Sequence, residues 1–316
     1  MTKHRIIAIE EHFSDPVLGF GGNRPPSITD RLKDLGEWRL REMDEAGIDV
    51  QVLSMAGHAL YQKEPEEAVP LATDVNNRLY ETVNTNPDRF AGFASLPTTS
   101  PEAAADELER CVTDLGFKGA MTHGLTQGRF LDEREFWPIW ERAAKLDVPI
   151  YMHPAHPHPQ VIELYYKEYA KAYPSLVTAA GGYTWETATQ AIRMVLSGVF
   201  DEYPDLKIIL GHMGEGVPYL LWRIDHTLKN EGNEPIEFRE IFCKHFWITS
   251  AGFFSDPAMI CAMMEMGADR IIFSVDWPWG NNKEGVDWLD HMSLSAEDKA
   301  KIYHGNAENL LGMMRN

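Results

Sequence analysis

The sequence predicts an α/β fold in which eight parallel β-strands close into a single barrel with helices outside, spanning residues 1–316 as one domain. Short apolar runs rich in β-branched residues recur eight times along the chain. Amphipathic segments of helical length alternate with them. No linker, short-period repeat or low-complexity tract interrupts this alternation. An open, doubly wound sheet is the main alternative fold.

The strands and helices can be assigned in order from these patterns. We expect strands at residues 5–9, 48–54, 90–95, 117–121, 148–152, 206–210, 246–250 and 270–275. The expected helices are 30–46, 64–86, 101–115, 134–146, 184–200, 216–229, 256–267 and 295–313. Ser100 and Ser255 stand where a capping side chain is preferred, and Gly47, Gly116 and Gly267 stand where helices end.

Two connections are longer than packing requires. They are residues 13–29, after the first expected strand, and about 154–183, after the fifth. Long loops in a compact barrel usually serve a functional site. Both leave the carboxyl ends of strands, which is the face where barrel enzymes carry their chemistry, so we expect the site there.

Composition and charge exclude several classes of protein. The chain is 44% hydrophobic, enough for a sizeable core, which excludes a disordered protein. Its formal charge of −19 repels phosphate backbones and anionic lipid headgroups, so we expect neither a nucleic-acid partner nor a membrane partner. A small acidic substrate remains compatible with this charge, because a bound cation inverts the local field in a cleft.

The cysteines and the first residues bear on the compartment. Three cysteines without Cys-x-x-Cys spacing predict neither a disulfide framework nor a thiolate zinc site. The first residues carry too short an apolar run for a signal peptide, and no apolar stretch of 18 residues occurs. We therefore expect a cytoplasmic protein.

Acidic and imidazole side chains follow four of the expected strands. Glu10 and His12 follow the first strand, His153 the fifth, His212 the sixth and Asp276 the eighth. The carboxyl ends of barrel strands meet at one mouth. These side chains are therefore expected to gather there.

A metal site is the chemistry that this set favours. Alternate side chains of a strand share a face, so Glu10 and His12 can both point inward while Glu11 points away. With His153 and Asp276 they supply two imidazoles and two carboxylates, which suit one divalent metal ion with open positions. The carboxylates favour Mn²⁺, with Zn²⁺ as the alternative. A single histidine near a strand end is more often structural, so the prediction depends on the coincidence across strands.

The residues in this order resemble the amidohydrolase superfamily, and within it the branch of non-oxidative aromatic acid decarboxylases such as those of γ-resorcylate, 2,3-dihydroxybenzoate and 5-carboxyvanillate. The similarity spans nearly the whole chain. The stretches that carry it are IAIEEHF at 7–13, YMHP at 151–154, SGVFDEYPDLKIILGHMGEGVPYLLWRIDH at 197–226, SVDWPW at 274–279 and GNAENLLG at 305–312.

The resemblance implies roles for individual residues. Glu10, His12, His153 and Asp276 would bind the metal, which would hold a carboxylate oxygen and the adjacent phenolic oxygen of an aromatic acid. Asp276 would protonate the ring carbon before carbon dioxide leaves, because direct cleavage would leave an unstabilised aryl carbanion. His212 would lie beside the substrate or behind the metal, and Glu215 would bond to His212.

The resemblance also bears on the assembly of the protein and on its cofactors. Arg223 would contact the substrate or the acids of the site, and in some relatives this stretch lies near a neighbour's site. A homodimer or homotetramer is therefore expected. No organic cofactor is implied.

Several residues outside the metal set are open to two interpretations. His58 either contacts the substrate or packs within a loop. Trp185 either closes over a planar ring or packs in the core. His156 and His158 are expected to be solvent-exposed loop histidines rather than substrate contacts.

Two other functions use the same residues. A metal-bound hydroxide with Asp276 as a proton shuttle would hydrolyse an amide or a lactone. A metal-stabilised binding or assembly protein would have lost catalysis, although the retained acid argues against this. A decarboxylase releases carbon dioxide without consuming water, whereas a hydrolase incorporates solvent oxygen.

Overall fold

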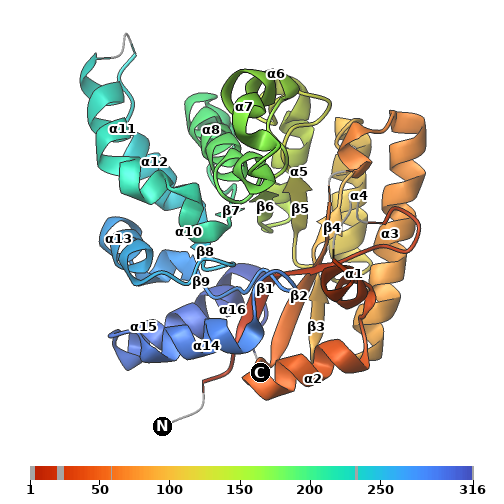
Figure 1. The fold of residues 1–316 in the computed structure, drawn as a ribbon. Coiled ribbons are helices and arrows are strands. Elements are labelled where there is room, and N and C mark those ends of the chain that lie inside the picture. The colour runs from red at the N-terminus through yellow and green to blue at the C-terminus, as the bar shows by residue number, and fades with distance from the viewer. Residues whose placement is uncertain (1–3, 20–24, 58, 232–233, 315–316) are drawn as a thin grey trace.

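The strands form a parallel barrel, as the alternation predicts. A computed structural model describes residues 4–19, 25–57, 59–231 and 234–314 (Figure 1). Its strands are β1 Ile7–Phe13, β2 Val50–Met55, β3 Phe90–Gly92, β4 Ala94–Ser95, β5 Ala120–His123, β6 Ile150–His153, β7 Ile208–Leu210, β8 Phe246–Thr249 and β9 Ile271–Ile272. Every pairing between consecutive strands within the two sheets is parallel.

Backbone hydrogen bonds join the two sheets into one closed wall. β3 and β4 are a single barrel strand interrupted at Phe93, whose N–H donates to Leu53 O while Ala94 N–H donates to Gly119 O. On the other side, His12 N–H donates to Trp277 O and Asp276 N–H donates to Glu10 O. A parallel bridge between Glu11 and Trp277 completes this seam between the first and last strands.

Helices surround the barrel in roughly the predicted places. The longer ones are α1 Pro26–Lys33, α2 Glu37–Ala46, α3 Pro65–Thr85, α4 Pro101–Thr113, α5 Trp137–Lys145, α8 Gly182–Leu196, α11 Val217–Glu231, α12 Phe238–His245, α13 Asp256–Met266 and α14 Asn282–His291. The shorter ones are α6 Pro159–Val161, α7 Lys167–Ala170, α9 Val199–Glu202, α10 His212–Glu215, α15 Ala296–Ala300 and α16 Asn306–Leu311.

The helix boundaries depart from the prediction in identifiable ways. The expected helix 30–46 is two helices, because the chain leaves helical geometry between Lys33 and Glu37. Ser100 and Ser255 occupy N-cap positions, but neither side chain makes the expected capping bond. Gly47 does end α2 in the left-handed conformation, with φ +79°, where glycine avoids the penalty of a Cβ.

Within the barrel, a bulge in β1 changes which residues face inward. Ile7 and Ile9 belong to the apolar cluster that fills the interior, together with Val52, Phe93 and Ile209 from other strands. Strict alternation would then turn Glu11 inward. The register with β2 shifts by one residue between Ala8 and Glu11, so Glu10 and His12 take the inward positions instead.

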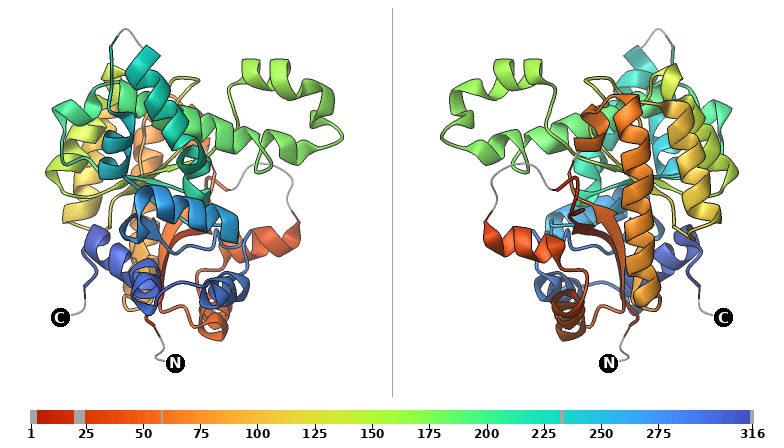
Figure 2. Two further views of the ribbon diagram at one scale, coloured as in Figure 1. Left: turned by 90° about the vertical axis from the view of Figure 1, so that its left-hand side faces the viewer. Right: turned by 90° about the vertical axis from the view of Figure 1, so that its right-hand side faces the viewer.

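The two long connections lie on the same side of the molecule. Figure 2 shows the segment after β6, which contains α6 and α7, projecting from the body above α1. α1 follows the connection that leaves β1. Among the described residues no helix is both long and apolar enough to cross a membrane.

Candidate metal centre and active site

Glu10 lies at the floor of the site and is fully buried. One carboxylate oxygen, Oε2, accepts hydrogen bonds from the Tyr151 hydroxyl and, at 3.2 Å, from Thr249 Oγ1. The other oxygen, Oε1, has no hydrogen-bond partner among the described residues. Burial raises the pKa of Glu10 to about 7, so a cation bound beside it would favour the ionised carboxylate.

Two imidazoles are fixed through one ring nitrogen each. His12 Nδ1 lies 3.1 Å from Ser54 Oγ, and His153 Nδ1 lies 2.8 Å from Pro154 O. Their Nε2 atoms therefore face the centre, where His12 Nε2 is 3.2 Å from Asp276 Oδ1 and His153 Nε2 is 3.2 Å from Glu10 Oε1. Burial lowers the pKa of both rings, that of His153 to about 4, so both are neutral imidazoles suited to ligation.

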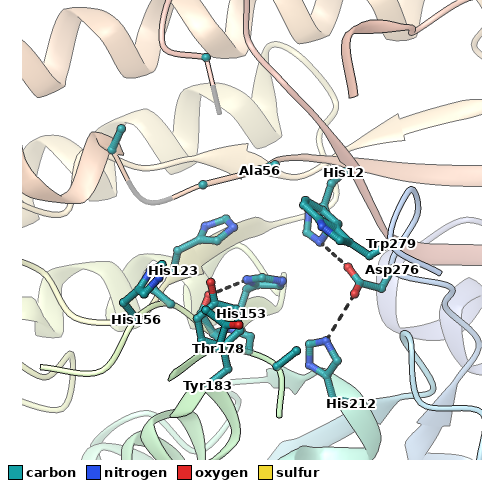
Figure 3. Close-up of a pocket in the computed structure, with 16 residues that line it drawn as sticks. His12, Ala56, His123, His153, His156, Thr178, Tyr183, His212, Asp276 and Trp279 are labelled. Atoms are coloured by element: carbon teal, nitrogen blue, oxygen red, sulfur yellow. Dashed lines mark hydrogen bonds and ion pairs between the residues drawn. The ribbon is translucent and has the colours of Figure 1, made fainter. Parts of the chain in front are cut away.

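Asp276 and His212 close the site from the last and sixth barrel strands (Figure 3). His212 Nε2 lies 3.8 Å from Asp276 Oδ2, and His212 Nδ1 lies 2.7 Å from Glu215 Oε1. Burial would lower the pKa of His212, but the charges of Glu215 and Glu10 outweigh it and raise the pKa well above its usual value. Burial would raise the pKa of Asp276, but the His12 and His212 rings outweigh it and lower the pKa. These opposite shifts favour an ionised Asp276 beside a protonated His212.

The four predicted ligands come together in space. Glu10, His12, His153 and Asp276 each offer one atom to a set in which all atoms lie within 4.8 Å of one another. Two of these atoms, Glu10 Oε1 and His12 Nε2, are buried and have no hydrogen-bond partner among the described residues. A divalent cation fits this donor set, since it would satisfy both atoms and both carboxylates.

A cavity of about 260 Å³ adjoins this cluster. Small residues make up much of its wall: Ala56, Gly57, Ala59, Ala155 and Ala179. His12, His123, His153, His212 and Asp276 supply its polar groups, and Tyr183 and Trp279 add aromatic rings. The mixture of apolar wall and convergent polar groups is typical of a site for a small organic molecule.

Neither Trp185 nor Arg223, two of the three predicted substrate contacts, lines the cavity. His58 lies outside the described residues. Trp185 does not line the cavity, because its position on α8 leaves the side chain 55% exposed, and Tyr183 lines it instead. Arg223 is exposed on α11 and is also not among the cavity-lining residues. His156 is exposed as expected but does line the cavity, whereas His158 caps α6 by accepting Gln160 N–H.

His123 is a functional candidate that the sequence reasoning missed. Its ring centroid lies 4.6 Å from that of His153, and with His12 and His153 it forms a second group of possible ligands. β5 runs to His123, two residues beyond the expected strand end at 121. His123 stands two residues after the expected strand end, as His212 stands two residues after 210, so the same strand-end signal marks it in the sequence.

Replacing Gly211 with alanine is expected to weaken binding of Mn²⁺ by about tenfold or more, through displacement of Glu10. An added Cβ would lie 2.8 Å from Glu10 Oε2 and 3.1 Å from the Tyr151 hydroxyl, while φ of −73° suits alanine. Isothermal titration of the apoprotein with Mn²⁺ measures the change. Gly305→Ala is the control, since its helical backbone and its nearest atom at 3.6 Å predict unchanged affinity.

Comparisons with known proteins identify the family of the chain. The family model described as amidohydrolase matches residues 7–313, so the chain belongs to the amidohydrolase family. The gamma-resorcylate decarboxylase of Polaromonas sp. (strain JS666 / ATCC BAA-500) is 40% identical over 98% of this chain and 99% of its own.

Solved structures of similar proteins contain a metal and aromatic ligands. A dihydroxybenzoic acid decarboxylase from Polaromonas sp. JS666, with bound manganese and the inhibitor 2-nitroresorcinol, superposes with a TM-score of 0.92 at 40% identity, covering 99% of this chain and 98% of that one. A 2,6-dihydroxybenzoate decarboxylase complexed with 2,6-dihydroxybenzoate has a TM-score of 0.90 at 38% identity, covering 98% and 99%. The predicted family and barrel fold are thereby confirmed.

Proposed function

We infer that this member of the amidohydrolase family is a metal-dependent, non-oxidative decarboxylase of an ortho-hydroxylated aromatic acid, with 2,6-dihydroxybenzoate (γ-resorcylate) as the first candidate. The observation that carries the inference is the cluster of Glu10, His12, His153 and Asp276 beside a cavity of about 260 Å³ that is walled largely by small residues. A divalent cation, with Mn²⁺ favoured by the manganese in a similar decarboxylase, would be held by these four residues. No organic cofactor is proposed, because protonation of the ring carbon itself provides the acceptor for the electron pair that carbon dioxide leaves behind.

The proposed reaction exchanges a proton for carbon dioxide. When bound, the cation supplies a Lewis acid that withdraws charge from the oxygens of the substrate. Asp276, in its acid form, gives a proton to the ring carbon that bears the carboxylate, which interrupts the aromatic system. The carbon–carbon bond then breaks, its electron pair restores the aromatic ring, and carbon dioxide leaves.

His212 and Glu215 are proposed to supply the proton that Asp276 delivers. His212 holds the proton at rest, with Nε2 3.8 Å from Asp276 Oδ2. Glu215 fixes the His212 ring by its contact of 2.7 Å to Nδ1, which leaves Nε2 facing Asp276. The pair thus stores a proton next to the acid that must donate it, and solvent restores it after each turnover.

The proposed function is tested by measuring carbon dioxide release. Metal-loaded protein is incubated with 2,6-dihydroxybenzoate, 2,3-dihydroxybenzoate and 5-carboxyvanillate, with and without chelator. We expect release from at least one acid, its loss with chelator, and deuterium at the vacated ring carbon when the solvent is D₂O. A stoichiometric metal without release, together with incorporation of ¹⁸O from water into an opened amide or lactone, would instead establish a hydrolase.

The compartment and the assembly are also proposals. Cys111, Cys243 and Cys261 are free thiols, which suits the reducing cytoplasm. α11 and α13 pack against each other and present apolar side chains to solvent, including Tyr219, Trp222 and Met264. Such an exposed apolar surface is typical of a subunit contact, so we propose a homodimer or homotetramer with Arg223, next to Trp222, near the contact.

Trp222→Glu is expected to shift the protein toward monomer. Trp222 is 64% exposed, and a carboxylate in a buried subunit contact would be left unpaired. Light scattering after size exclusion measures the mass against 35.9 kDa for one chain. Leu164→Glu is the control, because Leu164 is 78% exposed but lies in the segment after β6, away from α11 and α13. Its mass should equal that of the parent. A parent protein that is monomeric at micromolar concentration would contradict the proposal.

A further inference from the structure

The backbone of Asp276 is held in an unfavourable conformation. Its φ is +65°, in the left-handed region that residues other than glycine seldom adopt. Such a conformation persists only when surrounding contacts fix it. The contacts that fix Asp276 therefore also determine where its carboxylate lies.

Glu11 supplies two of these contacts. Its carboxylate accepts the N–H groups of the residues on either side of Asp276, Val275 at 2.9 Å on Oε1 and Trp277 at 3.3 Å on Oε2. Glu11 is fully buried and points away from the barrel interior, so it does not line the cavity. One side chain thus fixes the backbone on both sides of Asp276.

Gln51 and Arg39 connect Glu11 to His12 through hydrogen bonds. The Gln51 amide donates to Glu11 Oε2 at 3.3 Å, and its carbonyl accepts from Arg39 Nη1 at 3.2 Å. Arg39 Nη2 donates to the backbone carbonyl of His12. The Arg39 guanidinium also lies 3.9 Å from the ring centroid of Trp277. All three network side chains, Glu11, Gln51 and Arg39, are fully buried.

Closure of the barrel does not require this network of buried polar side chains. Backbone bonds already join β1 to the last strand at His12, Trp277, Glu10 and Asp276. Burying a carboxylate and a guanidinium is costly unless their geometry is satisfied, and apolar residues could have filled the same space. The network instead forms hydrogen bonds to the backbone at His12 and on both sides of Asp276. The side chains of these two residues meet in the site, where His12 Nε2 lies 3.2 Å from Asp276 Oδ1.

We propose that Glu11, Gln51 and Arg39 are positioning residues that hold Asp276 and His12 in the geometry needed for metal binding and proton delivery. The part of the proposal that concerns proton delivery rests on the proposed function, whereas the part that concerns metal binding does not. Outer contacts of metal ligands typically change metal affinity or activity by about 10-fold to 100-fold.

The proposal is tested with Glu11→Gln, in which the side chain keeps its size. One carboxylate oxygen that accepts a backbone N–H becomes an amide nitrogen, which can only donate. We expect Mn²⁺ affinity, measured by titration calorimetry of the apoprotein, to fall about 10-fold or more. At saturating Mn²⁺ we expect kcat to fall by a similar factor, with KM changed by less than about threefold. Affinity is measured without substrate, so an unchanged affinity counts against the positioning role, and absence of carbon dioxide release from the parent counts against the proposed function.

Two further variants separate positioning from general stability. Glu107→Gln removes another buried carboxylate that is paired with an arginine, Arg110, on α4, away from the site, and it should lower the melting temperature without changing Mn²⁺ affinity. In an Asp276→Asn background, Glu11→Gln should lower Mn²⁺ affinity by a smaller factor than in the parent, because the part of its effect that acts through Asp276 is already lost and only the part through His12 remains. An equal loss in both backgrounds, or none in the parent, would overturn the proposal.

If Glu11→Gln does not fold, Gln51→Met serves in its place. Methionine has a similar length and removes only the bridge between Glu11 and Arg39. It should reduce Mn²⁺ affinity and kcat in the same direction by a smaller factor. Parent values of both quantities in folded Gln51→Met would equally overturn the proposal.

Discussion

Asp276→Asn should lower carbon dioxide release by about a thousandfold or more, at the upper end of what a positioned general acid contributes. An amide cannot donate the acid proton and is a poorer metal ligand. Asparagine tolerates the left-handed backbone at φ +65° better than most residues, so the local fold should persist. Initial rates at saturating Mn²⁺ and substrate measure kcat.

Metal content and melting temperature of this variant must be measured alongside kcat. Asp256→Asn is the matched control, since this aspartate at the start of α13 accepts a bond from Trp288 Nε1 and lies outside the cavity. Its kcat should equal that of the parent. Near-parent turnover by a metal-loaded Asp276→Asn protein would rule out proton donation by this residue.

Removal of the metal is expected to abolish carbon dioxide release and to lower the melting temperature, and Mn²⁺ should restore both. A ligand that binds only the folded state stabilises it by about 4 kcal/mol at a thousand times its dissociation constant. In the apoprotein Glu10 Oε1 and His12 Nε2 are buried without hydrogen-bond partners among the described residues. The cation relieves this cost, so the expected stabilisation follows from the site itself.

The pH dependence of this stabilisation has a definite sign. Burial raises the pKa of Glu10 from 4.5 to about 7, so the folded apoprotein binds more protons than the unfolded chain between these values. The stability of the apoprotein should therefore fall as pH rises from about 4.5 to about 7. Mn²⁺ requires the ionised carboxylate, so its effect on the melting temperature should grow over the same interval.

Calorimetry at several pH values, with Mn²⁺ or with chelator, measures this difference. Glu10→Gln provides the control, because an amide does not titrate and should remove most of the pH-dependent gain. An increment from Mn²⁺ that is constant between pH 5 and pH 7.5 would show that Glu10 does not govern metal binding.

The sequence predicted the barrel because its strands are short, β-branched and separated by amphipathic segments. It did not place the strand ends correctly, since β5 runs two residues beyond its expected end, to His123. His123 nevertheless stands as close to its expected strand end as His212 does, so it could have been predicted. It also missed α14, where Gly285 interrupts the helical pattern although the residue packs against Phe254. The single-domain organisation remains a prediction.

The inward positions of Glu10 and His12 were predicted for an incomplete reason. Alternation groups them together, but the apolar interior residues Ile7 and Ile9 are in the opposite phase. Only the bulge in β1 reconciles the two, and bulges leave no reliable signature in a single sequence. The roles assigned to individual site residues remain predictions.

The contacts around the cavity could be predicted less well than the metal cluster. The metal cluster comes from strand ends, whose positions the barrel dictates. Tyr183 and His156 instead come from the long segment after β6, where tertiary packing decides which side chain turns toward the cavity. Trp185 and Tyr183 are two residues apart, and nothing in their spacing distinguishes them.

The seam between the first and last strands has a consequence for how the protein matures. Glu10 and His12 are synthesised first, but their partner Asp276 follows more than 260 residues later. Contacts so distant in sequence carry a large entropic cost and form late in folding. A chain without the last strand therefore lacks one of the four predicted ligands, and the full set can assemble only once the ring of strands has closed.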